Sequence, residues 1–428
     1  MWQHSRNSLA MTPVWSRRDW MRCTLGFGVS CVLPGLELKA AKLRGEERPK
    51  SLLTIWLSGG PSQLETWDPH PGTKIGGLVK SIPTKIPDVS IADLYPQTAE
   101  QIDAVSIVRS MVSEEGDHER GSYYLKTGYR PDTQLIHPAL GAIVVHEHPR
   151  ETLEIPPFVS LGDGPFPSRG GYLGDRFDAF RVFSPRQGLY NMKAPVDDDR
   201  QTRRLKNLEV VSRTFRAQRQ DRLEKTLHQH TIEQALKMMS SEQLKAFRFE
   251  EEPAGVRESY GDHDFGIGCL IGRRLIEEGV QSVEVILPGW DSHANNHTGH
   301  VTQAQLLDGP LAALLHDLRE RDLLQSTVVL CLGEFGRTPT INPLDGRDHW
   351  PTGFSCLIGG AGLRSGVVIG ATDPTGASKQ PTDPIKVKDL FATVLKALDI
   401  EPGNQLITPI GRPMMYSEGT PIAQLLPG

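Results

Sequence analysis

Three short segments of the sequence concentrate the residue types that bind metal ions or stabilise anions. Their candidate metal ligands are Asp291, His293, His297, Glu334, Asp348 and His349. Carboxylate oxygens and imidazole nitrogens are common ligands of divalent metals. Arg337 follows Glu334 by three residues, and its planar guanidinium could bind two oxygens of a phosphate or sulfate. Any one segment could be a surface ion pair, but three together favour a metal-dependent site.

The three polar segments lie next to short apolar runs that are predicted to be strands of a sheet. The runs span residues 52–57, 105–108, 158–161, 282–287, 327–332 and 355–358. Continuous apolar runs of this length are typical of strands that are buried on both faces of a parallel sheet. Ligands of open parallel sheets bind at the carboxyl ends of the strands. We therefore expect the polar segments to meet at one edge of the sheet.

A glycine turn follows the first run and offers a further candidate. Gly59 and Gly60 allow a sharp turn whose N–H groups could face an anion, and Ser62 follows them as a possible nucleophile. An ordinary tight turn is the alternative interpretation.

Helical patterns alternate with the apolar runs. Residues 268–278, 301–324 and 386–398 have apolar positions at helical spacing. This alternation predicts an α/β fold with three α/β/α layers and a mostly parallel central sheet. Residues 197–247 interrupt the rhythm, because they are highly charged and helical in period. We interpret them as an inserted helical segment, either a solvated structural element, a lid or an assembly surface.

Composition excludes two classes of protein, and the N-terminus indicates export. The 428-residue chain has a net charge of −5, which gives no electrostatic reason to expect nucleic-acid binding. No run beyond the first forty residues is long enough to span a membrane. Arg17 and Arg18 precede a short apolar stretch that ends near Ala40 and Ala41, the pattern of a twin-arginine signal peptide. We expect residues 1–41 to be this signal and 42–428 to form the exported domain; an uncleaved basic arm is the alternative.

Four motifs together resemble a known family. They are residues 57–63 (LSGGPSQ), 289–293 (GWDSH), 333–339 (GEFGRTP) and 346–351 (GRDHWP). The set closely resembles a secreted bacterial family of planctomycete type, catalogued as domain of unknown function 1501. That family in turn looks like a remote branch of the alkaline phosphatase/sulfatase superfamily. The resemblance implies a three-layer α/β/α hydrolase with one or two metal ions.

The resemblance also identifies a departure at the position of the nucleophile. Residues 118–130 are similar to the nucleophile helix of sulfatases, but His118 occupies the place of the reactive cysteine or serine. A sulfatase with formylglycine chemistry is therefore not expected. The nucleophile could be water activated by the metal, His118 or Ser62.

These observations predict an exported hydrolase of phosphate or sulfate esters, either small molecules or polysaccharides. Asp291, His293, Glu334 and His349 would hold a divalent metal, such as zinc, manganese or calcium, with His297 and Asp348 as alternates. Arg337 would stabilise charge on the ester, and His118 would act as nucleophile or general acid/base. The rival hypothesis is a secreted binding protein that keeps the fold without catalysis. The sequence defines no oligomeric state.

Overall fold

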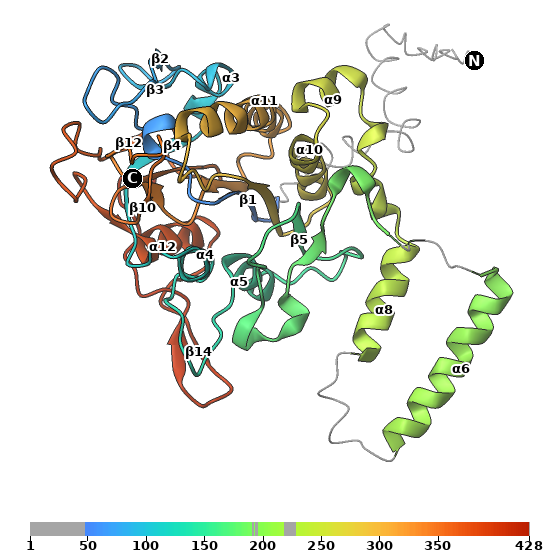
Figure 1. The fold of residues 1–428 in the computed structure, drawn as a ribbon. Coiled ribbons are helices and arrows are strands. Elements are labelled where there is room, and N and C mark those ends of the chain that lie inside the picture. The colour runs from blue at the N-terminus through green and yellow to red at the C-terminus, as the bar shows by residue number, and fades with distance from the viewer. Residues whose placement is uncertain (1–47, 191, 193–195, 218–227, 428) are drawn as a thin grey trace, which may run out of the picture. The chain divides into compact units, whose positions relative to one another are not determined.

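The computed structural model describes residues 48–190, 192, 196–217 and 228–427 (Figure 1). The expected signal segment, residues 1–41, lies outside these described residues. No described helix is both long enough and apolar enough to pass through a membrane.

A nine-stranded sheet forms the centre of residues 50–428, in the order β12-β4-β11-β8-β1-β7-β5-β6, with β13 beside β4. Its strands are β1 (Ser51–Ser58), β4 (Ser106–Val112), β5 (Phe158–Leu161), β6 (Phe180–Val182), β7 (Ser282–Pro288), β8 (Thr327–Leu332), β11 (Phe354–Gly359), β12 (Val368–Ile369) and β13 (Ile385–Lys386). All pairs are parallel except those of β11, which runs antiparallel to β4 and β8. Each of the six apolar runs forms a strand, so the predicted mostly parallel sheet is confirmed.

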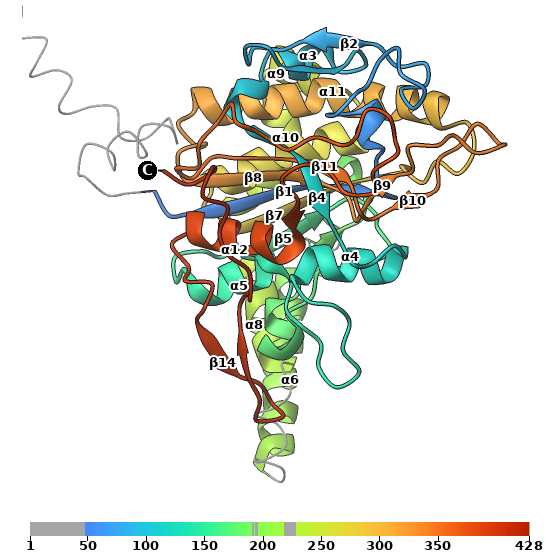
Figure 2. The same ribbon diagram turned by 90° about the vertical axis from the view of Figure 1, so that its left-hand side faces the viewer.

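Helices cover both faces of the sheet, as Figure 2 shows. One face carries α10 (Asp264–Glu277) and α11 (Asn296–Glu320), with the short helices α3 (Pro96–Ala99) and α9 (Ala254–Tyr260). The other carries α4 (His118–Thr127), α5 (Leu140–Glu147) and α12 (Val387–Ala397). The three layers expected from the alternation of strands and helices are therefore present.

The side-chain alternation of β1 explains why both faces are apolar. Leu53, Ile55 and Leu57 point into the core shared with α10 and α11. Leu52 and Trp56 point to the opposite side, into the core shared with α4 and α12. Because successive side chains of a strand alternate between faces, a strand covered on both sides must be apolar throughout.

Two helices begin earlier than their apolar periodicity predicted. α10 begins at Asp264 rather than at residue 268, because the His263 side chain accepts a hydrogen bond from the Gly266 N–H and caps the helix. α11 begins at Asn296 rather than at residue 301. Its first turn carries polar residues that follow the GWDSH motif, which is why hydrophobic spacing did not find it.

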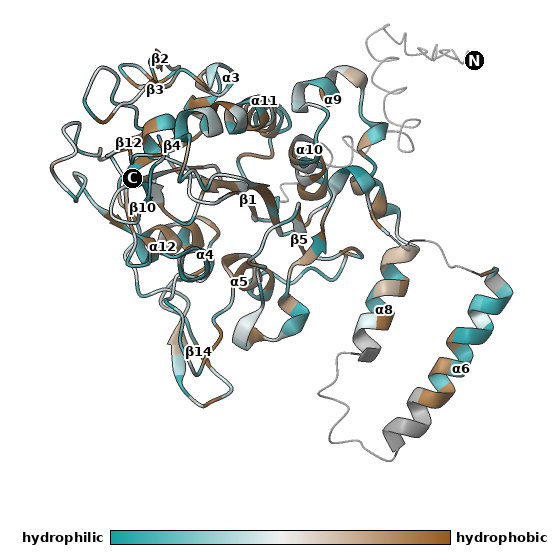
Figure 3. Cartoon of the chain, in the orientation of Figure 1, coloured by the Kyte–Doolittle hydropathy of each residue, from teal (hydrophilic) through white to brown (hydrophobic). Residues whose placement is uncertain are grey.

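Three two-stranded sheets and the charged helices complete the described chain. The small sheets pair β2 (Ser81–Pro83) with β3 (Ser90–Ala92), β9 (Gly336–Arg337) with β10 (His349–Trp350), and β14 (Gln405–Ile407) with β15 (Pro413–Met415). The described part of residues 197–247 is largely helical, with α6 (Asp198–Ala217), α8 (His228–Met239) and the 3-10 helix η6 (Glu242–Phe247). Figure 3 shows α6 as largely hydrophilic, whereas α8 contributes the buried Met238 to the core.

Candidate metal centre

Four segments of the chain bring polar side chains to the carboxyl edge of the sheet. The segment between β7 and α11 supplies Asp291 and His293, and the segment after β8 supplies Glu334. His349 lies on β10, and His118 is the first residue of α4. Asp117 caps that helix by accepting hydrogen bonds from the N–H groups of Glu119 and Arg120, which fixes where His118 stands.

Asp291 is the residue on which three histidines converge. Its Oδ2 lies 3.2 Å from Nε2 of His118, and its Oδ1 lies 3.2 Å from Nε2 of His293 and 3.5 Å from Nε2 of His349. The Nε2 atoms of His293 and His349 are 3.0 Å apart. We call these four residues the histidine cluster. Donor atoms that share one zinc ion at bond lengths of ~2.0–2.1 Å lie about 3.3 Å apart in tetrahedral geometry, so these separations suit a metal site.

Each histidine of the cluster has its other ring nitrogen bound. The acceptors for Nδ1 of His118, His293 and His349 are Glu334 Oε1 at 2.8 Å, Asp348 Oδ1 at 2.9 Å and the Gly116 carbonyl at 2.7 Å. Carboxylates and carbonyls accept hydrogen bonds, so each Nδ1 donates its proton and leaves the lone pair on Nε2. Metal-binding histidines almost always have this second hydrogen bond.

Charge and burial also favour a cation at this place. The cluster contains the carboxylate of Asp291 and is bordered by those of Glu334 and Asp348, against the guanidinium of Arg337. With neutral imidazoles, negative charges exceed positive charges by two, which one divalent ion would balance. His118 Nε2 and Glu334 Oε2 are buried without a hydrogen-bond partner. The donor set of His118, Asp291 and His349, whose ligand atoms lie within 4.8 Å of one another, fits a divalent metal.

The pKa shifts of His349 and Asp291 favour the protonation states in which these side chains can bind a metal ion. Burial lowers the pKa of His349, which favours its neutral form. Burial works to raise the pKa of Asp291, but the hydrogen bond and charge of Arg337 outweigh it and hold that pKa below its usual value. His118 differs, because its hydrogen bond to Glu334 raises its pKa. A proton on its Nε2 would compete with a metal ion.

Glu334 and His118 differ from the roles expected of them. Glu334 is fully buried, and its Oε1 accepts hydrogen bonds from the Gly59 N–H at 2.9 Å and from His118 Nδ1. This oxygen therefore orients His118 and holds the glycine turn. His118 in turn directs Nε2 at Asp291 Oδ2, 3.2 Å away.

Arg337, expected from the sequence as a charge clamp, directs its hydrogen-bond donors at the chain itself. The side chain is fully buried. Nε donates to the Gly60 carbonyl at 2.9 Å, Nη1 to the Arg347 carbonyl at 3.0 Å, and Nη2 to Asp291 Oδ1 at 2.6 Å and to the Gly59 carbonyl. Since its hydrogen-bond donors are directed at the chain itself, Arg337 is a positioning residue for Asp291.

Ser62 and His297 also lie apart from the cluster. Ser62 is fully buried, and its hydroxyl accepts from the Leu64 N–H to cap the 3-10 helix η1 (Gln63–Glu65), while its N–H donates to Nε2 of His300. This structural role does not suit a nucleophile. His297 lies on the first turn of α11 and is not one of the three residues whose ligand atoms converge, and its Nδ1 is buried without a hydrogen-bond partner.

Sequence reasoning missed Arg347, which holds the loop before His349. The fully buried Arg347 donates Nε and Nη2 to Glu65 Oε1, at 3.1 and 3.0 Å. Its Nη1 donates to the carbonyls of Thr338 and Pro339, and Nη2 also donates to the Ile75 carbonyl. The residue stands inside the GRDHWP motif, but spacing gives no signal that separates a structural arginine from a substrate-binding one.

The fold and the site together define an α/β protein with a candidate metal centre at the carboxyl edge of its sheet. Residues 49–426 match the family described as Protein of unknown function (DUF1501), and the chain belongs to this family. No curated protein sequence matches the chain significantly.

Several solved structures resemble this chain at low similarity. The lipoteichoic acid synthase of Listeria monocytogenes is 10% identical, with 86% of this chain and 74% of that chain covered and a TM-score of 0.39. A sulfatase from Pseudoalteromonas sp. is 11% identical, with coverages of 86% and 71% and a TM-score of 0.36. An alkaline phosphatase superfamily protein from Vibrio parahaemolyticus is 12% identical, with coverages of 83% and 67% and a TM-score of 0.37. Similarities this low do not transfer an activity, so function must be judged from the site.

Proposed function

We propose that this protein is an exported, metal-dependent hydrolase of phosphate or sulfate esters, of the alkaline phosphatase/sulfatase type. One observation carries the proposal: three histidines, each with Nδ1 hydrogen-bonded to an acceptor, direct Nε2 at the single carboxylate of Asp291. Imidazole nitrogens that converge on one carboxylate form a donor set that suits a divalent cation.

His118, Asp291 and His349 would hold the ion, with Glu334 and the Gly116 carbonyl fixing the two imidazoles. A divalent metal held there would polarise an ester oxygen and lower the pKa of water. Zinc is the metal that this mixed nitrogen and oxygen set suits best, with manganese next.

His293 has a different place, at the outer side of the cluster. Its side chain is 47% exposed, compared with 29% for His118 and 22% for His349. Asp348 fixes its Nδ1, so Nε2, which faces His349 and Asp291, is the atom that would accept or return a proton. We assign the His293–Asp348 pair to general acid/base chemistry, the role that the sequence had suggested for His118.

The proposal is tested by metal analysis and an ester panel on the purified protein. We expect bound zinc or manganese and cleavage of at least one class among aryl phosphates, phosphodiesters and aryl sulfates. His349→Ala should lose both metal and cleavage. His293→Ala should keep the metal and lose at least ~10²-fold in turnover, the usual scale for general acid/base catalysis.

The binding-protein alternative is favoured by one specific observation. Ser62 and Arg337, the residues expected as nucleophile and charge clamp, are both buried and hydrogen-bonded to the chain. A folded, metal-loaded protein that cleaves no member of the panel would support metal-dependent binding instead.

Export is tested separately, since replacing Arg17 and Arg18 with lysine should retain the precursor in the cytoplasm.

A further inference from the structure

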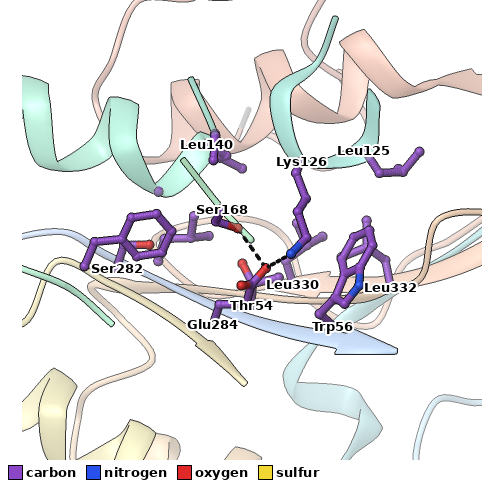
Figure 4. A pocket seen from close by; sticks show the side chains of 14 residues that line it. Thr54, Trp56, Leu125, Lys126, Leu140, Ser168, Ser282, Glu284, Leu330 and Leu332 are labelled. Atoms are coloured by element: carbon purple, nitrogen blue, oxygen red, sulfur yellow. Dashed lines mark hydrogen bonds and ion pairs between the residues drawn. The ribbon is translucent and has the colours of Figure 1, made fainter. Parts of the chain in front are cut away.

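A buried ion pair joins the helix that carries His118 to the sheet. Lys126 is the only buried lysine among the described residues. Its Nζ lies 2.7 Å from Glu284 Oε1 (Figure 4). It also donates to the Phe166 carbonyl at 2.8 Å. The side chains of Lys126 and Glu284 are only 7% and 5% exposed.

The surroundings match this pair closely. Ser160 donates to Glu284 Oε2 at 3.0 Å, and Ser168 donates to Oε1 at 3.1 Å. Nζ also lies 4.8 Å from the ring centroid of Trp56, over its electron-rich face. The adjoining cavity is about 30 Å³, which leaves room for roughly one water molecule. The space is too small for a substrate, so the pair is not itself a binding site.

Stability alone does not explain an ion pair in this position. Replacing a buried pair with neutral side chains of similar size is often neutral or stabilising, because burying two charges costs as much as their attraction returns. Side-chain hydrogen bonds of His118, Arg120 and Tyr123 join α4 to residues outside the strands, whereas Lys126 reaches a strand itself. Elsewhere α4 packs closely against its neighbours, and a Cβ added at Gly121 would lie 3.2 Å from Phe335. Directional bonds add something that such packing lacks, a fixed register.

The partners lie on the elements that supply the histidine cluster. Lys126 follows His118 by eight residues of α4, about 12 Å along the helix. Glu284 is the third residue of β7, the strand that leads to Asp291. Trp56 is on β1, just before the Gly59 N–H that binds Glu334.

We propose that Lys126 and Glu284 are positioning residues that fix α4 against β7, so that His118 Nε2 stays within ligand distance of Asp291. The inference rests on the proposed metal centre for its significance, but the anchoring of α4 can be measured without metal. A small slide or rotation of α4 would move Nε2 away from the 3.2 Å separation from Asp291 Oδ2. A displacement of this kind weakens a metal site without unfolding the protein.

The test uses a pair of substitutions that removes both charges but keeps the fold. Lys126→Met alone leaves Glu284 charged and buried, and it should lower stability. The double variant Lys126→Met/Glu284→Gln removes this defect and retains an oxygen for the serine hydroxyls, so its stability should return close to that of the unmodified chain. Cobalt(II) affinity and the cobalt d–d absorption spectrum then report the geometry of the ligands.

Arg273→Met provides the matched control. Arg273 is fully buried and lies within 3.4 Å of the carboxylates of Glu252, Glu277 and Asp317. Asp317 is about 30 Å along α11 from Asn296, where that helix begins next to the cluster. The control therefore introduces a comparable buried-charge defect far from the metal centre.

We expect the double variant to bind cobalt at least ~10-fold more weakly, with a changed spectrum. In metal-free protein, we expect faster amide hydrogen exchange confined to residues 118–127. Arg273→Met should lose stability but bind cobalt within about twofold of the unmodified chain. Unchanged affinity and exchange in the double variant would overturn the positioning role, as would an equal loss of affinity in the control. If the unmodified chain binds no cobalt, the proposed metal centre fails, and the exchange of residues 118–127 alone decides whether the pair anchors α4.

Discussion

The loop around β10 contributes to two polar regions that use the same residue types in opposite ways. Arg347 lies two residues before His349, and it binds Glu65 and three backbone carbonyls in a fully buried network. We call Arg347 and Glu65 the buried arginine pair. In the histidine cluster, by contrast, the Nε2 atoms of three histidines converge on the carboxylate of Asp291.

The contrast between the buried arginine pair and the histidine cluster distinguishes polar groups that stabilise the fold from polar groups that can bind a ligand. A polar group whose hydrogen bonds are complete inside the chain stabilises the fold and has nothing left for a ligand. Groups that converge with their bonding capacity unused cost free energy until a ligand arrives. Arg337 follows the first rule although it lies beside the cluster, so proximity alone does not make a residue functional.

Asp291→Asn should produce the largest effect. The amide keeps the shape and an acceptor for Arg337, but it removes the negative charge on which the three histidines converge. We expect metal affinity to fall by at least about 100-fold, since a first ligand matters more than the outer partners that cost 10–100-fold. Isothermal titration with zinc or cobalt measures this, and thermal unfolding of metal-free protein provides the control. An asparagine variant with unchanged affinity would show that the cluster holds no metal.

Arg347→Met should have the next largest effect, on stability. Removing the guanidinium leaves Glu65 buried without its cation, which typically costs about 3–5 kcal/mol. Urea unfolding followed by circular dichroism measures the loss. The variant Arg347→Met/Glu65→Gln should recover part of it, because no charge then remains unpaired. A loss below about 1 kcal/mol would mean that the buried arginine pair contributes no more to stability than an exposed salt bridge does.

Glu334→Gln should have a smaller effect, on the metal. Glutamine can still accept from His118 Nδ1, but it lacks the charge that makes the imidazole a stronger ligand. We expect metal affinity to fall about 10-fold, while unfolding of the metal-free protein changes little. A loss as large as that of Asp291→Asn would instead return Glu334 to the set of direct ligands.

The sequence predicted the sheet and the place of the site for physical reasons. Strands buried on both faces must be apolar throughout, so all six runs could be found without structural data. The antiparallel direction of β11 could not, because an apolar run carries no sign of its direction. Asp291 and His293 follow β7, so the meeting of carboxyl strand ends at one edge accounts for their position. His349 precedes β11 and reaches the same edge only because β11 is antiparallel.

The roles of single residues could not be predicted, because they depend on which atom faces which partner. His118 was expected to react, but the Nδ1 contact with Glu334 turns its Nε2 toward Asp291. Nothing in the spacing of Glu334 distinguishes a ligand from the partner of a ligand. The sequence did contain a signal for the buried ion pair of Lys126 and Glu284. Glu284 is a charged residue within an otherwise apolar strand, and such residues are rarely buried unless paired.

Glu115 is intermediate between the buried arginine pair and the histidine cluster. Its substitution should have the smallest effect on stability. Its carboxylate receives hydrogen bonds from Arg120 and Arg130, but these arginine side chains are 49% and 51% exposed, so solvent screens the interaction. Glu115→Gln should therefore reduce the free energy of unfolding at neutral pH by about 1 kcal/mol or less. The carboxylate itself is buried, but both of its arginine partners remain in contact with solvent.

The pH dependence distinguishes this ionic contribution from simple packing. The hydrogen bonds of Arg120 and Arg130 lower the pKa of Glu115 from 4.5 to about 2 in the folded protein. Because the folded pKa is depressed, the stabilisation is fully present above the unfolded pKa and is lost as pH falls from about 4.5 towards about 2. The difference in unfolding free energy between the unmodified chain and Glu115→Gln should therefore be smaller at about pH 3 than at about pH 7. A difference that stays constant over this pH interval would show that Glu115 stabilises the fold through its shape. The ion pairs of Glu115 with Arg120 and Arg130 would then add nothing to stability.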